Sequence, residues 1–300
     1  MKYYVLYNAM AGHGKAEQVA RGLEGKLDGE VAGLADMTKI TNYAAFLSDK
    51  TDGALLICGG DGTLNRFVND TADITLENEI FYCATGTGND FLRDVYPDAE
   101  AGVPVCITKY LKDLPTVEVN GKKSKFINGI GFGIDGYCCE VGDKLRAGGK
   151  TDINYTAIAI KGLLLSFKPR CATVTVDGVE HKYKKVWIAP VMHGRFYGGG
   201  IMPTPEQMRN AGDGKLSTLV FHRSGRLKTL MIFPSLFKGE HLKNKKYVEV
   251  LCGKDITVEF DNPTPLQIDG ETVLGVIKYR AYGANISASD KKAECAAVEQ

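Results

Sequence analysis

The sequence predicts an N-terminal α/β domain with a parallel sheet, followed by a mainly antiparallel β domain, a sandwich or an open barrel. Two observations lead to this. Over about the first hundred residues, short apolar runs typical of buried strands alternate with segments whose apolar residues recur at helical spacing. From Thr116 onward, short alternating runs dominate, and hairpin dipeptides such as Asn120-Gly121 and Asp177-Gly178 separate them. We therefore expect domains at 1–114 and 115–283, with 284–300 as a tail, helical or partly frayed, that could pack back on the first domain.

Composition narrows the class of protein. With 300 residues, 44% hydrophobic and 24% charged, the chain has the composition of a globular protein long enough for two domains. A formal net charge of +1 provides no general field for nucleic acid, so no nucleic-acid partner is expected. No run approaches the roughly 18 apolar residues of a membrane span. Residues 1–7 look like a first strand rather than a signal peptide, and eight scattered cysteines lack zinc-site spacing, so we expect reduced thiols and a cytoplasmic protein.

Four strands of the first domain are expected in order, most of them leading into a helical pattern. They are residues 3–7, 31–37, 54–58 and 80–84. Glycine-rich loops follow the first, third and fourth of these strands, at 8–15, 59–65 and 85–93. Because the carboxyl ends of parallel strands meet at one edge of a sheet, the three loops would converge there. Convergence of glycine loops at helix N-termini indicates an anion site.

The loop Gly59-Gly60-Asp61-Gly62-Thr63-Leu64-Asn65 is the most informative stretch of the chain. Three glycines in four residues let the backbone approach a ligand closely and present its N–H groups at the start of a helix. A carboxylate at Asp61 would repel phosphate unless a divalent cation lay between them, which favours a nucleotide polyphosphate with Mg²⁺. The alternative is a tight strand-to-helix turn in which Asp61 only caps the helix.

The second domain is expected to contain short strands and one or two helices. The strands are 117–119, 173–176, 186–189, 247–250 and 256–260, and the helical stretches are 154–167 and 226–237.

Motifs in both halves occur in an order and spacing that resemble one family. The first half carries Asn8-x-x-x-Gly12-x-Gly14, the Gly59–Asn65 loop and Gly86-Thr87-Gly88-Asn89-Asp90-Phe91; the second half carries 128–135, Tyr197-Gly198-Gly199-Gly200, Asp213-Gly214-Lys215-Leu216 and Asp269-Gly270-Glu271. Together they resemble the diacylglycerol kinase catalytic-domain family of soluble bacterial lipid kinases, over about residues 3 to 280.

The resemblance implies a Rossmann-like ATP-binding domain and a β-sandwich substrate domain, with the active site in the cleft. It implies an ATP- and Mg²⁺-dependent kinase that transfers the γ-phosphate to the hydroxyl of diacylglycerol or a related lipid alcohol. By motif position, ATP would meet Asn8, Gly12, Thr38, Gly59, Gly60, Asp61, Gly62, Thr63, Asn65, Thr87 and Asn89. Asp213 would bind a metal with main-chain oxygens near Asn210 and Lys215. Glu271 would accept the proton of the substrate hydroxyl, with Asp61 as the rival for that role.

The chain departs from the family pattern at three places, which keeps other functions open. Ala9 stands where the family usually has Pro, and Arg66 stands where it usually has Glu, beside the expected triphosphate site. The loop Met192-His193-Gly194, before the triple glycine, lacks the Asn that the family commonly has there. The alternatives are an NAD or sugar kinase of the same superfamily, against which the 86–91 motif argues, and a non-catalytic nucleotide- or lipid-binding regulator.

A basic stretch of the second domain bears on membrane contact. Lys238, Lys243, Lys245 and Lys246 adjoin the apolar run 230–237 and could touch anionic lipid at the inner membrane face, or simply form a solvated surface. Monomer and homodimer both remain open.

Overall fold

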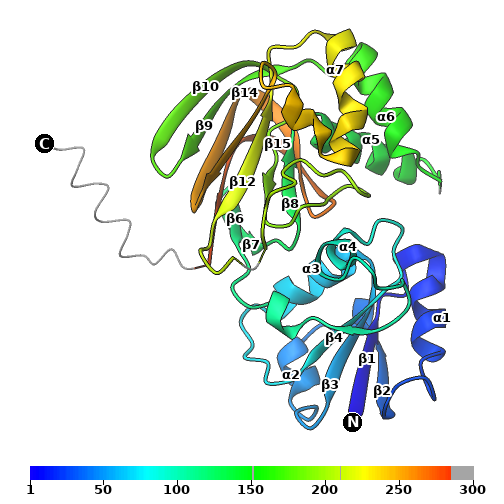
Figure 1. Ribbon diagram of the computed structural model, residues 1–300. Coiled ribbons are helices and arrows are strands. Elements are labelled where there is room, and N and C mark those ends of the chain that lie inside the picture. The colour runs from blue at the N-terminus through cyan, green and yellow to red at the C-terminus, as the bar shows by residue number, and fades with distance from the viewer. Residues whose placement is uncertain (151, 210, 285–300) are drawn as a thin grey trace, which may run out of the picture.

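The computed structural model describes residues 1–150, 152–209 and 211–284 and contains two sheets, each with its own helices (Figure 1). The predicted C-terminal tail, apart from its first residue, and Asn210 therefore lie outside the described residues. The first sheet ends at Cys106 and the second begins at Thr116. The two sheets lie on either side of the expected boundary at 114/115, which stays a prediction.

The first sheet has the strand order β2-β1-β3-β4-β5, and its first four strands are parallel. The strands are β1 (Lys2–Tyr7), β2 (Glu30–Asp36), β3 (Ala54–Gly59), β4 (Ile80–Ala84) and the short antiparallel β5 (Val105–Cys106). Its helices are α1 (Lys15–Arg21), α2 (Tyr43–Leu47), α3 (Asp61–Asp70) and α4 (Asp90–Val95), with 3₁₀ turns η1 (Ala11–Gly14), η2 (Met37–Lys39) and η3 (Thr108–Tyr110). The predicted parallel sheet is confirmed.

Strand β3 shows why this sheet forms. All six of its residues are buried, and alternate side chains enter different cores. Leu55 and Ile57 join the core packed by α2, α3 and α4, whereas Leu56 and Cys58 join the core packed by α1. A strand buried on both faces belongs in a parallel sheet covered by helices on each side.

The second sheet is antiparallel, as predicted, and has ten strands, more than the alternating runs in the sequence indicated. Its main path runs β13-β12-β11-β8-β14-β15-β6-β7, and β9 pairs with both β14 and β10. The strands are β6 (Thr116–Val119), β7 (Lys122–Lys125), β8 (Gly129–Phe132), β9 (Arg170–Val176), β10 (Val179–Val186), β11 (Val191–Met192), β12 (Leu216–Phe221), β13 (Val248–Gly253), β14 (Asp255–Ile268) and β15 (Glu271–Tyr282). Asn120-Gly121, Asp177-Gly178 and Asp269-Gly270 all have positive φ and connect successive strands, as type I′ hairpin turns require.

A helical layer covers part of the second sheet (Figure 1). It consists of α5 (Ile134–Ala147), α6 (Tyr155–Lys161), the π turn η4 (Gly162–Ser166), α7 (Arg226–Ile232) and the 3₁₀ turns η5 (Phe233–Lys238) and η6 (Glu240–Lys243). Helices α6 and α7 lie in the two expected stretches. Helix α5 was not expected, because its buried face (Ile134, Gly136, Cys138, Gly142) is made mostly of small residues, which give no apolar stripe. Among the described helices, none is both long enough and apolar enough to span a bilayer.

Candidate functional site

The carboxyl ends of β1, β2 and β3 bring three predicted site residues together. Strand β1 has β2 on one side and β3 on the other, so the strand order reverses at this point, which is where open α/β sheets bind their ligands. Asn8 Nδ2 donates to Thr63 Oγ1 across this point at 3.2 Å. Thr38 is held nearby, because its N–H and hydroxyl both donate to the Asp36 carboxylate, at 3.0 and 2.9 Å. Gly12 lies in η1, in the loop after β1.

The glycine loops after β3 and β4 touch each other through their backbones. A β-carbon added to Gly86 would lie 2.9 Å from Gly60 Cα, and one added to Gly59 would lie 2.4 Å from Thr63 Cβ. Only glycine allows both approaches. Gly60 is the N-cap of α3, so the amides of Asp61 and Gly62 begin a ten-residue helix at this contact. The loops thus form an anion-binding arrangement at a helix N-terminus.

The Asp61 carboxylate joins these two loops rather than capping its own helix. Its oxygens accept from Asp90 N at 2.9 Å and Phe91 N at 3.0 Å, which are the first amides of α4. Asn89, the N-cap residue of α4, has left-handed backbone geometry (φ 49°) and leaves this capping position to Asp61. Asp61 is therefore a cap, but of α4 rather than α3.

Two further carboxylates connect the first domain to the second. Asp90 Oδ2 accepts from Gly199 N at 2.7 Å. Asp269 accepts from three consecutive amides, of residues 127–129, and from Asn65 Nδ2 at 2.7 Å. The Asn65 side chain, which was predicted to bind ATP, therefore donates to residues of the second domain. These bonds fix the edge of the first sheet against the β14–β15 turn.

Burial makes this carboxylate cluster electrostatically expensive. Burial raises the pKa of Asp61 and of Asp269, and it raises the pKa of Asp90 to about 6. The negative charge of Asp61 also raises the pKa of Asp90 and of Asp269. The buried guanidinium of Arg209 compensates: it binds Asp94 Oδ2 and Asn128 Oδ1, each at 3.0 Å. It also lies over the Phe91 ring, 4.9 Å from the centroid.

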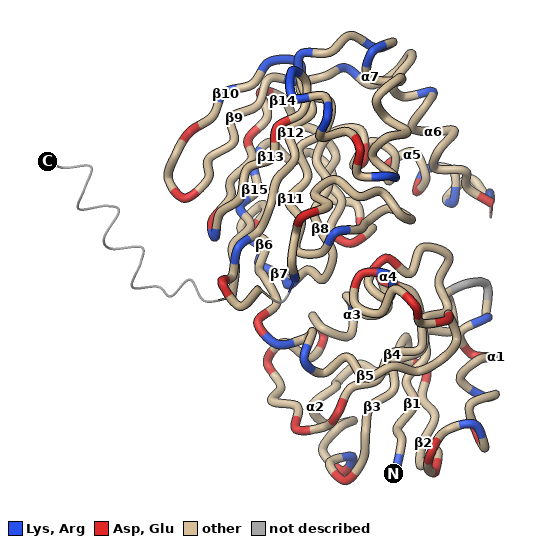
Figure 2. The backbone as a smooth tube through the Cα atoms, viewed as in Figure 1, with Lys and Arg blue, Asp and Glu red and all other residues tan. Residues whose placement is uncertain are grey.

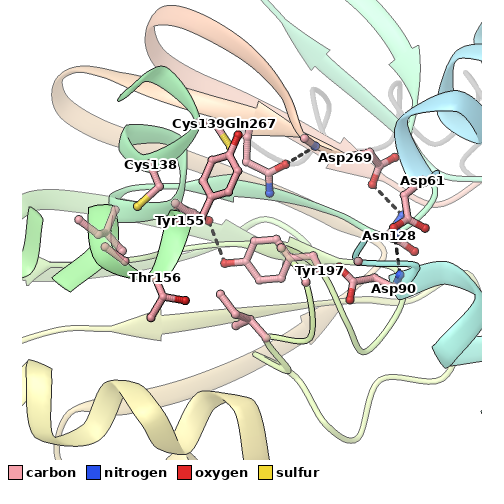
Figure 3. A pocket seen from close by; sticks show the side chains of 18 of the residues that line it. Asp61, Asp90, Asn128, Cys138, Cys139, Tyr155, Thr156, Tyr197, Gln267 and Asp269 are labelled. Atoms are coloured by element: carbon pink, nitrogen blue, oxygen red, sulfur yellow. Dashed lines mark hydrogen bonds between the residues drawn. The ribbon is translucent and has the colours of Figure 1, made fainter. Parts of the chain in front are cut away.

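One cavity of about 380 Å³ begins at this cluster and extends under the helical layer (Figure 3). Its polar end comprises Asp61, Thr87, Asp90, Asn128 and Asp269. The remaining wall is largely apolar and comes from α5, α6, η5 and neighbouring loops, with Ile134, Cys138, Cys139, Tyr155, Ala159, Ile188, Ile201, Phe233 and Phe237 among its members. The space is thus amphipathic along its length.

A buried pair interrupts the apolar wall. The Tyr197 hydroxyl donates to Asp135 Oδ2 at 2.9 Å, and burial raises the pKa of Asp135 to about 6. A β-carbon on Gly131 would lie 2.0 Å from the same carboxylate oxygen, so glycine makes room for it. The largely apolar wall of the cavity therefore includes one buried polar pair.

Glu271 begins β15 and is exposed. A β-carbon on Gly62 would lie 3.9 Å from Glu271 Oε1, which places this carboxylate at the start of α3. The Glu271 carboxylate thus lies near the N-terminus of α3 on the solvent side, whereas Asp61, the first residue of α3, lines the cavity.

Of the residues predicted to bind metal, Asp213 and Lys215 do not join this cluster, and Asn210 lies outside the described residues. Asp213 is exposed, accepts from Lys215 N at 3.0 Å and pairs with the Lys215 ammonium at 3.5 Å. Lys215 O accepts from Gln207 Nε2. Asp213 and Lys215 line a second cavity of about 310 Å³, with Arg209 in its wall. Within the described parts of the chain, no three His, Cys, Asp or Glu side chains are placed to hold a metal on their own.

Several site residues escaped the sequence analysis. Arg209 and Asp36 stand outside glycine motifs, so nothing in their neighbourhood marks them. Asp135, Asn128 and Asp269 stand inside quoted motifs, yet a motif does not tell which side chains face the cavity.

Two family descriptions match this chain. Residues 2–119 match "Diacylglycerol kinase catalytic domain", and residues 128–281, more than half of the chain, match "YegS C-terminal NAD kinase beta sandwich-like domain". The chain belongs to the diacylglycerol kinase catalytic-domain family. This confirms the predicted resemblance and indicates a kinase, that is, a phosphotransferase.

Individual proteins agree with the family assignment over nearly the whole length. A diacylglycerol kinase of Mycobacterium tuberculosis is 26% identical over 297 residues, covering 92% of this chain and 94% of that protein. The crystal structure of a diacylglycerol kinase from Bacillus anthracis superposes with a TM-score of 0.58 at 18% identity, covering 94% and 93% of the two chains. At this identity the superposition shows the shared fold.

Proposed function

We propose that this protein is an ATP- and Mg²⁺-dependent lipid kinase that transfers the γ-phosphoryl group to the hydroxyl of diacylglycerol or a related lipid alcohol. The observation that carries the proposal is the amphipathic cavity. Its carboxylate end adjoins the glycine loops, and its apolar wall suits acyl chains. A lipid alcohol has the same division between a hydroxyl end and an apolar body.

The glycine loops would bind the nucleotide. Asn8, Thr38 and Thr63 lie at the carboxyl ends of β1, β2 and β3, and the amides of Asp61 and Gly62 begin α3 beside them. Phosphoryl transfer asks a protein mainly for positioning and charge neutralisation, which backbone amides supply. Thr87 lines the cavity where the two substrates would meet.

The donor set at the cluster fits a magnesium ion bound jointly with phosphates. Asp90 Oδ1 and Asn89 Oδ1 are buried oxygens for which the described residues supply no hydrogen-bond partner. Mg²⁺ in kinases commonly takes one or two carboxylates, with phosphates and water as its other ligands. When bound, the ion would neutralise phosphate charge beside Asp61 and Asp90. A second, bracing site at Asp213, Asn210 and Lys215 stays a prediction.

Glu271 is the better candidate for proton acceptor. Both oxygens of Asp61 already accept backbone hydrogen bonds that hold α4 in place. Glu271 lies at the start of α3 with its side chain exposed to solvent, so a bound hydroxyl could reach it. Asp61 would then position the loops and the phosphates.

Two other functions remain as alternatives. The description of the matched second domain mentions NAD kinase, but the largely apolar cavity wall favours a lipid over a dinucleotide acceptor. The alternative of a non-catalytic regulator depends on Arg66, which stands where the family usually has Glu. Its side chain pairs with Asp70 one turn along α3, at 3.2 Å, so its charge is partly offset within the helix.

The test is phosphoryl transfer from radiolabelled Mg-ATP to a panel of acceptors: diacylglycerol, monoacylglycerol, ceramide, NAD and a sugar phosphate. We expect label in a lipid product and none in NAD or sugar. Transfer only to a soluble acceptor, or ATP binding without any transfer, would contradict the proposal.

A further inference from the structure

The cavity that begins at the carboxylate cluster has a limited volume. It measures about 380 Å³, and part of that space lies at the polar end beside Asp61, Thr87 and Asp90. A methylene group takes up nearly as much space as a water molecule does in the liquid, so at roughly 30 Å³ each the whole cavity holds about a dozen such groups. A diacylglycerol with two long acyl chains contains far more groups than this. The volume therefore suits a polar head and one chain, but not two chains.

The end of the cavity away from the carboxylates suits hydrocarbon. Figure 3 shows Cys138 and Tyr155 at this end and Asp61 at the other. Helix α6, which contributes Tyr155 and Ala159 to the wall, adds no charge to it. Figure 2 shows α6 largely uncharged, since Lys161 is its only charged residue, and Lys161 does not line the cavity. An alkyl chain whose hydroxyl lies beside the carboxylates would extend along this wall.

Helix α5, which forms another part of the wall, is held in close contact with two neighbouring elements through glycines. A β-carbon on Gly142 would lie 2.7 Å from Tyr155 Oη of α6, and one on Gly136 would collide with Pro265 O of β14. The Arg146 guanidinium of α5 also donates to Tyr155 Oη at 2.6 Å. Moving α5 away to admit a second chain would leave voids at both glycine contacts. The structure therefore favours a cavity that does not widen easily.

Aromatic rings of η5 form a further part of the wall. Phe233 and Phe237 pack edge to face, with their ring centroids 6.1 Å apart, and both line the cavity. Phe233 is buried and also belongs to the apolar core that α5, α6 and α7 share. Its ring cannot leave the cavity without opening that core, so this wall too resists expansion.

We propose that the acceptor of this kinase is a lipid alcohol with a single alkyl or acyl chain, such as a monoacylglycerol, and that Ala159 leaves the space which the chain occupies. Ala159 is 6% exposed and lines the cavity from α6. The inference rests on the proposed function, because it names the acceptor class of the same site. It narrows that class from lipid alcohols in general to those with one chain.

The experiment compares monododecanoylglycerol with didodecanoylglycerol, which carry the same acyl chain once and twice. Both are presented at equal mole fraction in micelles of a nonionic detergent. Native mass spectrometry of the purified protein without nucleotide gives the ratio of the two bound lipids, and radiolabelled Mg-ATP gives kcat/KM for each. We expect the single-chain lipid to be at least tenfold more abundant in the complex and to have at least a tenfold higher kcat/KM.

A variant and its matched control test the wall of the cavity. Ala159→Leu takes up space inside the cavity, so it should shift the preference from monododecanoylglycerol toward monohexanoylglycerol by about tenfold in kcat/KM. Ala157→Leu makes the same substitution at an exposed position of α6 and should leave that preference as in the parent. A thermal melt followed by circular dichroism shows whether each variant is folded, and the comparison of the two lipids in the parent needs neither variant.

The outcomes separate the choice of acceptor from the proposed function. Equal binding of the two lipids, an excess of didodecanoylglycerol, or binding of neither would overturn the single-chain proposal. So would an unchanged chain-length preference in a folded Ala159→Leu variant. Selective binding of monododecanoylglycerol without phosphoryl transfer to any lipid would leave the assignment of the cavity intact and defeat the proposed kinase activity.

Discussion

The edge of the first sheet and the cavity of the second domain are built from different atoms. At the sheet edge, backbone meets backbone: Gly60 and Gly86 approach so closely that a β-carbon on either would be crowded. In the cavity, side chains from helices and strands far apart in sequence form the wall, with the Asp135–Tyr197 pair among them. The first arrangement requires glycine at fixed places in short motifs, whereas the second does not mark in the sequence which side chains face the cavity. The comparison explains why the glycine loops could be recognised as a site from sequence, while the side chains that form the cavity wall could not be singled out within their motifs.

Glu271 stands where the two halves meet, so replacing it should have the largest effect. Glu271→Gln keeps the shape and removes the base, and kcat should fall roughly 10²–10⁴-fold with the KM for ATP little changed. Steady-state kinetics on the lipid acceptor would show this. Glu259→Gln, at an exposed glutamate of β14 paired with Lys278, is the control. A loss of less than tenfold would move the role of base to Asp61.

Arg209 tests whether buried side chains hold the two halves together. Arg209→Leu leaves Asp94 and the nearby carboxylates without their buried cation, so the free energy of unfolding should drop by roughly 3–5 kcal/mol. Urea denaturation would measure it. Arg195 also pairs with Asp94, but its side chain is 38% exposed against 4% for Arg209, and Arg195→Leu should cost about 1 kcal/mol or less. An equal loss of unfolding free energy in the two variants would show that Arg209 stabilises the cluster no more than Arg195 does.

The buried carboxyl group of Asp135 should make the free energy of unfolding depend on pH. Its pKa is raised to about 6 in the folded protein, above its ordinary value of 3.8, so the folded state binds the proton more tightly than the unfolded state. Its contribution to stability is then complete below pH 4 and is lost as the pH rises through 6, by about 3 kcal/mol. Asp135→Asn should become more stable relative to the parent over this range, measured by urea denaturation at several pH values. Asp261→Asn, at an exposed position of β14, should run parallel to the parent.

Gly86→Ala tests the backbone contact between the two glycine loops, and of these predictions it should have the smallest effect. Gly86→Ala puts a methyl group 2.9 Å from Gly60 Cα, so the loops must separate by a few tenths of an ångström. The KM for ATP should rise about tenfold, with kcat changed less, because misplaced loops weaken binding first. Gly225→Ala is the matched control, since a β-carbon there meets nothing within 4 Å. An unchanged KM would mean that this contact does not shape the phosphate site.

Much of the architecture could be predicted, and particular residues show where prediction stopped. The alternation of buried strands and helices around β3 pointed to a parallel sheet, and the Asp177-Gly178 dipeptide pointed to a hairpin that is present. Helix α5 was missed because its buried side is formed by small residues that suit close packing, as where Gly136 meets Pro265 O. Apolar periodicity detects large buried side chains and overlooks small ones.

The role of Asp61 shows the same limit inside the site. Its glycine neighbours identified the loop, but its hydrogen bonds to the first amides of α4 depend on how the β3 and β4 loops pack. Asp269 looked like half of a turn dipeptide, and its turn geometry is present. Its four hydrogen bonds to residues 127–129 and Asn65 come from chain segments more than a hundred residues away.

The sequence by itself determined the two fold classes, the order of the glycine loops and the family, because backbone conformation and strand burial restrict residue type locally. Only the tertiary structure decided which carboxylates share one buried cluster, where Arg209 compensates them, and that a largely apolar cavity extends from them beneath the helical layer of the second domain. Burial and electrostatics act through space, and residues that are neighbours in space here are rarely neighbours in the chain.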